Sequence, residues 1–189
     1  MKKALDKITA FYKKISDVAT PTAILAIICI VVTLALSSAN LLTKDTIKEL
    51  QIKNENAARQ KLMDGDYEEA QITIDGNKIN YHIVKDKKSD KIIGYIFKTS
   101  VKGYGGDISV MTAIKTDTSI VAIEILDASG ETPGLGQNVT KEKFYNQFKG
   151  KGGKIEAVTG ASISSKAVTD AVNKACDYAN KIITKGAKS

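Results

Sequence analysis

The chain has 189 residues, which is enough for one compact domain with appended segments. It contains one histidine, two cysteines and no tryptophan, and its net charge is +7. These counts argue against a multi-histidine or cysteine-ligated metal site, a disulfide framework and a nucleophilic triad. The lysines are scattered among acids and do not form the basic patch of a nucleic-acid-binding protein.

Residues 1–20 are predicted to form a basic amphipathic helix. Its lysines surround an apolar face made by Leu5, Ile8, Phe11, Tyr12 and Ile15. Such a segment lies well on an anionic inner membrane surface. The alternative is a plain solvated leader.

Residues 18–43 carry no charge, and the apolar part runs over residues 21–43. As a helix this part would be about 35 Å long, enough to cross a hydrocarbon core of about 30 Å. Pro21 suits the first turn of such a helix. We therefore predict a single transmembrane helix here.

A cleaved signal peptide is the competing interpretation, because small residues at Ser37-Ser38-Ala39 resemble a cleavage site. The long apolar run and the long leader before it favour a retained anchor. Lysines flank the run equally on both sides, so charge alone gives no orientation.

Residues 44–65 continue with a weak apolar stripe and are predicted to be a connecting helix that Gly65 ends. From Tyr67 the apolar period changes to two, which indicates strands. We expect a folded domain over residues 66–189. Its predicted strands lie near residues 67–74, 79–85, 92–100, 108–114, 120–126 and 155–158, and its helices near residues 141–148 and 163–183. The fold class is α+β: a single N-terminal transmembrane helix followed by a twisted antiparallel sheet with packed helices.

The stretch from Glu156 to Ser165 changes from a strand pattern to a helical period after Ser162. Ser162 is therefore expected at a helix N-cap. The first amides of a helix are unpaired and its dipole is positive there, so a phosphate esterified to Ser162 Oγ would be stabilised. The simpler alternative is that Ser162 only caps the helix.

Three motifs occur in one order along the chain: Gly103-Tyr104-Gly105-Gly106-Asp107-Ile108, Glu131-Thr132-Pro133-Gly134-Leu135-Gly136 and Thr159-Gly160-Ala161-Ser162. The last resembles the S/T-G-A-T/S flavinylation motif of the FMN-binding domain family, and the second is similar to that family's E-T-P-G-L-G loop. The family includes the G subunit of the Rnf electron-transport complex and the C subunit of the sodium-pumping NADH:quinone reductase. With the N-terminal anchor, the resemblance covers nearly the whole chain.

The resemblance implies FMN attached to Ser162 by a phosphoester that a separate flavin transferase installs. Two positions depart from the family pattern: Ser162 stands where threonine is commoner, and Glu156 stands where aspartate is usual. A hydroxyl and a carboxylate are nevertheless retained. Ser164 is the nearest alternative acceptor.

Further flavin contacts are expected from the same motifs. The glycines of the first motif precede a strand, which is not the arrangement of a dinucleotide fingerprint. The Gly/Lys loop over residues 149–154 lacks the spacing of a P-loop, but its last lysine lies close to the motif in sequence. The candidate FMN-binding residues are Tyr104, Glu131, Thr132, Gly134, Leu135, Gly136, Lys154, Thr159, Gly160, Ala161 and Ser162.

The implied function is that of a covalent-FMN electron carrier in an Rnf-type ferredoxin:NAD oxidoreductase coupled to ion transport. The chain would be a redox subunit rather than a complete enzyme, with no catalytic residue and no metal of its own. Its partners would be the other subunits, the membrane and the transferase. It would be a single-pass inner-membrane protein with its C-terminal domain on the outer face.

Two alternatives stay open. The first is a component of the sodium-pumping quinone reductase, whose members are usually longer. The second is a flavin-free, membrane-anchored binding module, which would be colourless after co-expression with a flavin transferase.

Overall fold

The computed structural model describes residues 2–74, 76–150 and 155–186. The chain forms two compact units, Met1–Gln51 and Ile52–Ser189. The helix α1 (Lys2–Leu62) supplies the first unit and the first residues of the second. Its part over Ala19–Leu62 is long and apolar enough to cross a membrane. Large apolar side chains there, such as Leu25 and Leu34, are 62% exposed, as expected for a surface that faces lipid.

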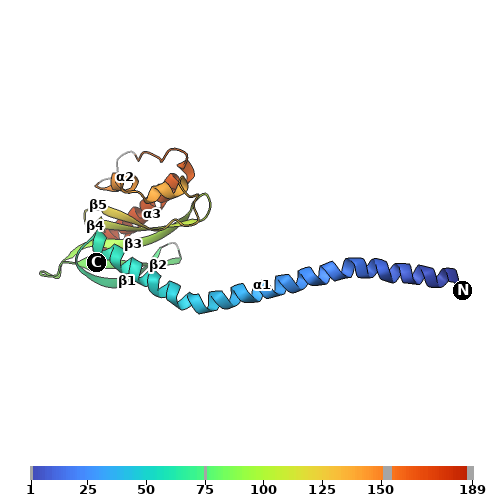
Figure 1. Ribbon diagram of the computed structural model, residues 1–189. Coiled ribbons are helices and arrows are strands. Elements are labelled where there is room, and N and C mark those ends of the chain that lie inside the picture. The colour runs from blue at the N-terminus through green and yellow to red at the C-terminus, as the bar shows by residue number, and fades with distance from the viewer. Residues whose placement is uncertain (1, 75, 151–154, 187–189) are drawn as a thin grey trace. The chain divides into compact units, whose positions relative to one another are not determined.

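The second unit is built on a five-stranded antiparallel sheet, labelled in Figure 1. The strands are β1 (Asp66–Ile74), β2 (Asn77–Lys85), β3 (Ile92–Lys102), β4 (Asp107–Lys115) and β5 (Ile120–Asp127). Their spatial order equals their chain order, so the sheet is a simple meander. The predicted α+β class is confirmed.

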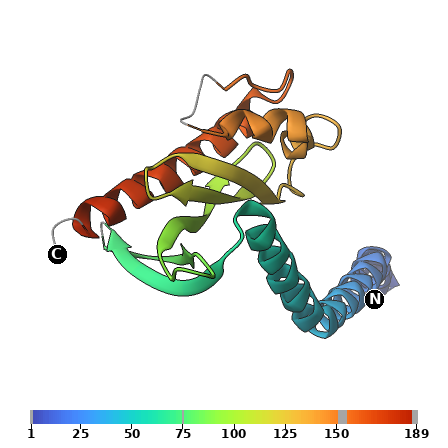
Figure 2. The ribbon, with the colours of Figure 1, turned by 90° about the vertical axis from the view of Figure 1, so that its left-hand side faces the viewer.

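Short helices follow the sheet, and one long helix ends the domain. These are η1 (Gly136–Thr140), α2 (Glu142–Tyr145), η2 (Asn146–Phe148) and α3 (Ser162–Gly186). Figure 2 shows α3 lying across one face of the sheet. Its buried residues include Ala167, Val168, Ala171, Val172 and Ala175, whose three- and four-residue spacing is that of an amphipathic helix.

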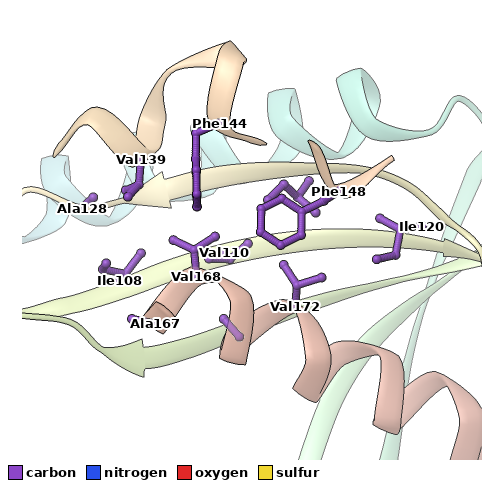
Figure 3. Packing of buried hydrophobic residues seen from close by; sticks show 12 residues of the cluster. Ile108, Val110, Ile120, Ala128, Val139, Phe144, Phe148, Ala167, Val168 and Val172 are labelled. Atoms are coloured by element: carbon purple, nitrogen blue, oxygen red, sulfur yellow. The ribbon is translucent and has the colours of Figure 1, made fainter. Parts of the chain in front are cut away.

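Two layers of apolar side chains hold this domain together. On the α3 side, Val168 and Val172 meet Val110 of β4 and the rings of Phe144 and Phe148 (Figure 3). The opposite face of the sheet is covered by the end of α1, where Ala58 and Leu62 are buried against Val84, Ile96 and Met111. The middle of β3 and of β4 is thus buried on both faces, and the N-terminal end of α3 is left beside the loops that follow β3 and β5.

One predicted strand is wrong. Residues 155–158 form no strand, because their backbone groups bond to side chains instead of a neighbouring strand. Glu156 donates its amide to Oε1 of Gln147 at 2.8 Å, and the Val158 amide donates to Oγ of Ser165 at 2.9 Å. The apolar residues Ile155 and Val158 still pack against the core.

Candidate functional site

A cavity of about 530 Å³ opens at the N-terminal end of α3. This volume lies within the range of about 300–1,000 Å³ that is usual for cofactor sites. The residues that line it come from the three motifs and from the two positions that follow the third: Tyr104, Thr132, Leu135, Gly136, Gly160, Ala161, Ser162, Ile163 and Ser164. The fold therefore brings together segments that are far apart in the sequence.

A tight turn delivers Ser162 to this cavity. The Ala161 amide donates to the Val158 carbonyl at 2.9 Å, and Gly160 has φ of +79°, a left-handed conformation that favours glycine. A Cβ at Gly160 would come within 3.3 Å of Cδ2 of Leu135, so the missing side chain also keeps this approach open.

The predicted N-cap position of Ser162 is wrong by one residue. The Ala161 carbonyl accepts the first helical bond, from the Ser165 amide at 2.9 Å, and Ser162 is the first helical residue. Ser162 is exposed, and its hydroxyl makes no hydrogen bond within the described part of the chain. Its Oγ is therefore free for chemistry rather than used as a cap.

The first turn of α3 supplies the electrostatics of an anion site. The amides of residues 162–164 precede the first amide that has an intrahelical acceptor. Free amides and the positive end of the helix dipole stabilise a phosphate group at this point.

Three exposed apolar side chains surround the cavity. Tyr104 is 69% exposed, Ile163 is 56% exposed and Leu135 is 49% exposed. Each comes from a different segment of the site. Together they offer the flat apolar contact that a planar aromatic ring requires.

Ser164 and Ser165 are buried, in contrast to Ser162. Ser165 Oγ accepts the Val158 amide, and Ser164 Oγ donates to Oε2 of Glu131. Ser162 is thus the exposed hydroxyl on this turn of the helix.

Glu131 is 1% exposed and lies behind the cavity wall. Its Oε1 accepts the amides of Gly105 at 3.1 Å and Gly106 at 3.4 Å. Burial by itself would raise the pKa of Glu131, but the hydrogen bonds from Ser164 and from the amides of the loop outweigh burial and hold the pKa below its usual value. The side chain is a buried carboxylate.

The expected site residues divide into those that line the cavity and those that do not. Tyr104, Thr132, Leu135, Gly136, Gly160, Ala161 and Ser162 line it. Glu131 and Gly134 do not, and Thr159 lines a second cavity of about 440 Å³ beside Glu156 and Lys141. Lys154 lies outside the described residues.

Sequence reasoning missed Ile163 as a wall of the cavity. Glu131 is among the candidate FMN-binding residues, and in the structure its carboxylate contacts Ser164 and the Gly105 and Gly106 amides. By sequence, Ile163 stands four residues before Ala167 and continues the apolar stripe of α3, so its place in the cavity wall is seen only in the structure. The partners of the Glu131 carboxylate have no sequence signal either, since only the fold brings these loops together.

The chain matches known proteins over most of its length. Residues 103–177 match the FMN-binding domain family. The G subunit of the Na⁺-translocating ferredoxin:NAD⁺ oxidoreductase complex of Acetobacterium woodii is 33% identical, and the match covers 79% of this chain and 86% of that protein. The G subunit of the ion-translocating oxidoreductase complex of Methanosarcina acetivorans is 30% identical, and the match covers 72% of this chain and 80% of that protein.

A solved structure also matches: NqrC of Shewanella oneidensis, with a TM-score of 0.45 and 22% identity, covering 61% of this chain and 65% of that chain.

The chain therefore belongs to the family of G subunits of ion-translocating oxidoreductase complexes, and it carries an FMN-binding domain. The residues of the cavity fit FMN. The free amides of the first turn of α3 suit the phosphate, and the rim of Tyr104, Leu135 and Ile163 suits the isoalloxazine ring.

Proposed function

We propose that this chain carries FMN covalently on Ser162 and relays electrons within an Rnf-type complex that couples ferredoxin oxidation and NAD reduction to ion transport. The observation that carries the covalent link is the position of Ser162: an exposed, unbonded hydroxyl at the first residue of α3, inside the FMN-sized cavity. The reaction of the complex is taken from the name of the Acetobacterium woodii relative.

The attachment is a phosphoryl transfer. Ser162 Oγ forms a bond to the phosphorus of FMN, the bond from that phosphorus to its leaving group breaks, and the hydroxyl proton is released. No electrons are exchanged in this step. A separate flavin transferase would catalyse it with an activated flavin nucleotide as the donor.

The chain's own residues would hold and orient the cofactor. The amides of Ile163 and Ser164 would hold phosphate oxygens, and Tyr104, Leu135 and Ile163 would bracket the ring. When bound, FMN supplies the electron-transfer chemistry, while the protein tunes it through contacts and charge.

The apolar part of α1 would be a single-pass anchor, with the short N-terminus inside and the FMN-binding domain on the outer face of the membrane. A covalent link is useful in that position, because an FMN that dissociated outside the membrane would be lost. Accessibility of a cysteine introduced at Lys166, an exposed position of α3, to a membrane-impermeant thiol reagent tests this orientation. Labelling only in opened cells would contradict it.

The test of flavin attachment is fluorescence of the denatured full-length protein on a gel, together with intact mass, after co-expression with a flavin transferase. The wild type and Ser164→Ala are expected to fluoresce and to carry the added mass, whereas Ser162→Ala is expected to be dark. A dark wild type, with the transferase active on a control protein, would contradict the proposal and favour a flavin-free binding module.

A further inference from the structure

Glu131 is the buried acid of the domain: among residues whose burial the structure describes, no other charged side chain is buried. No lysine, arginine or histidine of the described residues forms an ion pair with it. A buried carboxylate without a cation is costly unless hydrogen-bond donors replace the lost water. Hydrogen-bond donors are therefore expected around the Glu131 carboxylate.

The donors come from two separate segments. The loop between β3 and β4 contributes the amides of Gly105 and Gly106, at 3.1 Å and 3.4 Å from Oε1, and the first turn of α3 contributes the Ser164 hydroxyl to Oε2. Glu131 itself belongs to a third segment, which begins the loop after β5. One carboxylate thus joins the loops of the first two motifs to the first turn of α3, directly after the third motif.

Two glycines beside the carboxylate also indicate that the surrounding segments are packed closely around Glu131. A Cβ at Gly136 would lie 2.8 Å from Oε2 of Glu131 and 3.0 Å from Oγ of Ser164. A Cβ at Gly103 would lie 2.9 Å from the Cδ atom of Glu131. Glycines at these positions let the backbone close around the carboxylate.

The carboxylate lies immediately behind the cavity. Tyr104, Gly136 and Ser164 line the cavity. The Ser164 hydroxyl donates to the Glu131 carboxylate, and Gly136 lies beside that carboxylate. Tyr104 precedes Gly105, whose amide donates to the same carboxylate. A change at Glu131 therefore reaches each of the three segments that form the site without touching the space that FMN would occupy.

We infer that Glu131 is the positioning residue of the flavin site: its carboxylate fixes the three walls of the cavity, occupies the Ser164 hydroxyl so that Ser162 is the acceptor, and places a negative charge behind the bound flavin. This inference rests on the proposed attachment of FMN to Ser162. It assigns Glu131 a role through other residues, and not a contact with the cofactor.

Two substitutions separate the charge from the framework. In Glu131→Gln the amide oxygen still accepts from Gly105 and Gly106, and the amide nitrogen donates to Ser164 Oγ, so the walls stay in place while the charge is removed. In Glu131→Ala the two loop amides and the Ser164 hydroxyl lose their acceptor in a buried place.

The test uses full-length protein co-expressed with a flavin transferase, with three readouts: the FMN-loaded fraction, the modified residue found by peptide mass, and the flavin reduction potential. Glu131→Gln is expected to load within about twofold of wild type, because the two loop amides keep their acceptor and Ser164 Oγ keeps a hydrogen-bond partner. Its potential is expected to shift to a more positive value, because a nearby negative charge opposes reduction. Glu131→Ala is expected to lower the loaded fraction by at least about tenfold, since unsatisfied buried groups carry that cost.

A third variant tests the choice of acceptor. In Ser162→Ala, with Glu131 intact, no FMN is expected on Ser164, whereas modification of Ser164 would overturn the acceptor assignment. Thermal unfolding of each variant expressed without the transferase shows whether the domain folds. If Glu131→Ala does not fold, the potential of Glu131→Gln decides.

An unchanged flavin potential in Glu131→Gln would contradict the inference that the Glu131 charge acts on the flavin. Wild-type FMN loading in a folded Glu131→Ala would contradict the inference that Glu131 fixes the walls of the cavity. The proposed function stands in both cases, because the wild type is still fluorescent. A wild type that carries no FMN would instead remove the proposed function itself.

Discussion

The domain has two polar regions, one on each side of its sheet, and they are built on opposite principles. The first region, the Glu131 region, lies beside α3 and consists of one buried carboxylate surrounded by neutral hydrogen-bond donors. The second region, the α1-end region, lies beside the end of α1 and contains ion pairs that are partly exposed to solvent, such as Glu55–Lys98 and Lys61–Glu124. Exposed pairs are screened and lose side-chain entropy, whereas buried groups lose their full solvation when a partner is removed. We therefore expect substitutions to have large effects in the first region and small ones in the second.

The largest expected effect is that of Gly136→Ala. The new Cβ would approach Oε2 of Glu131 to 2.8 Å, and either the carboxylate or the Ser164 hydroxyl must move. Overpacking of this kind costs about 1–3 kcal/mol in free energy of unfolding, and we also expect the FMN-loaded fraction to fall. Loading by mass and denaturation followed by near-ultraviolet circular dichroism measure both.

The matched control is Gly76→Ala. Gly76 has a positive φ, +79°, but a Cβ there would meet nothing within 4 Å, and the residue lies in the turn between β1 and β2. Backbone strain alone is expected to lower stability while FMN loading stays at the wild-type value. Equal losses of FMN loading in the two variants would contradict the prediction that loading depends on the Glu131 region.

Two buried threonines beneath α3 allow the substitution of threonine by valine to be compared at a hydrogen-bonded hydroxyl and at a hydroxyl without a partner. Thr99 Oγ1 donates to the Ala171 carbonyl at 3.0 Å, whereas Thr112 Oγ1 has no partner among the described residues. We expect Thr99→Val to lower the free energy of unfolding by about 1–2 kcal/mol and Thr112→Val to leave it unchanged or raise it by up to about 1 kcal/mol. A loss of similar size at both positions would show that packing, and not hydrogen bonding, controls these sites.

A smaller effect is expected from His82, which belongs to the α1-end region. Burial and the neighbouring guanidinium of Arg59, whose Nη1 lies 2.5 Å from Nε2, lower the pKa of His82 below its usual value of 6.5. The unfolded chain therefore binds a proton at higher pH than the folded domain, so stability is present above about pH 6.5 and is lost as the pH falls through the folded pKa.

Thermal unfolding of the detergent-solubilised chain between about pH 7.5 and pH 5.5 measures this loss, since the range spans the usual histidine pKa. The variant His82→Gln is expected to show a flatter profile over the same range. Identical slopes for the two proteins would assign the pH dependence to other groups.

The smallest effect is expected from Lys98→Ala. The Lys98 side chain is 50% exposed and pairs with Glu55 at 2.6 Å, a geometry that contributes at most about 1 kcal/mol at the surface. We expect a change in the free energy of unfolding below that value, and no difference between wild type and variant in about 1 M salt. A loss as large as that of Gly136→Ala would remove the contrast between the two regions.

The fold could be predicted from the sequence where local pattern decides structure. The period of two from Tyr67 onwards and the helical spacing after Ser162 predicted the meander and α3 correctly. The strand predicted at residues 155–158 was wrong because an apolar alternation says nothing about which partner takes the backbone hydrogen bonds. Here the partners are the side chains of Gln147 and Ser165.

The site could be predicted in part, because its residues stand in recognisable motifs. The sequence predicted that the motif loop containing Glu131 belongs to the site, and residues of this loop line the cavity. Position along the chain does not reveal burial, so the direction of the Glu131 carboxylate was not foreseen. The same limit applies to Ser164, an apparently equivalent hydroxyl that the fold buries. Long-range contacts between loops carry this information, and no local pattern encodes them.

The open rim of Tyr104, Leu135 and Ile163 has a consequence for how strongly the cavity must bind. A ligand joined to Ser162 by one bond would be present at its own site at an effective concentration on the order of millimolar or above. Weak non-covalent contacts then suffice to keep the ring seated. The site can thus remain open on one side, and under the proposed function a redox partner would reach the flavin from that side.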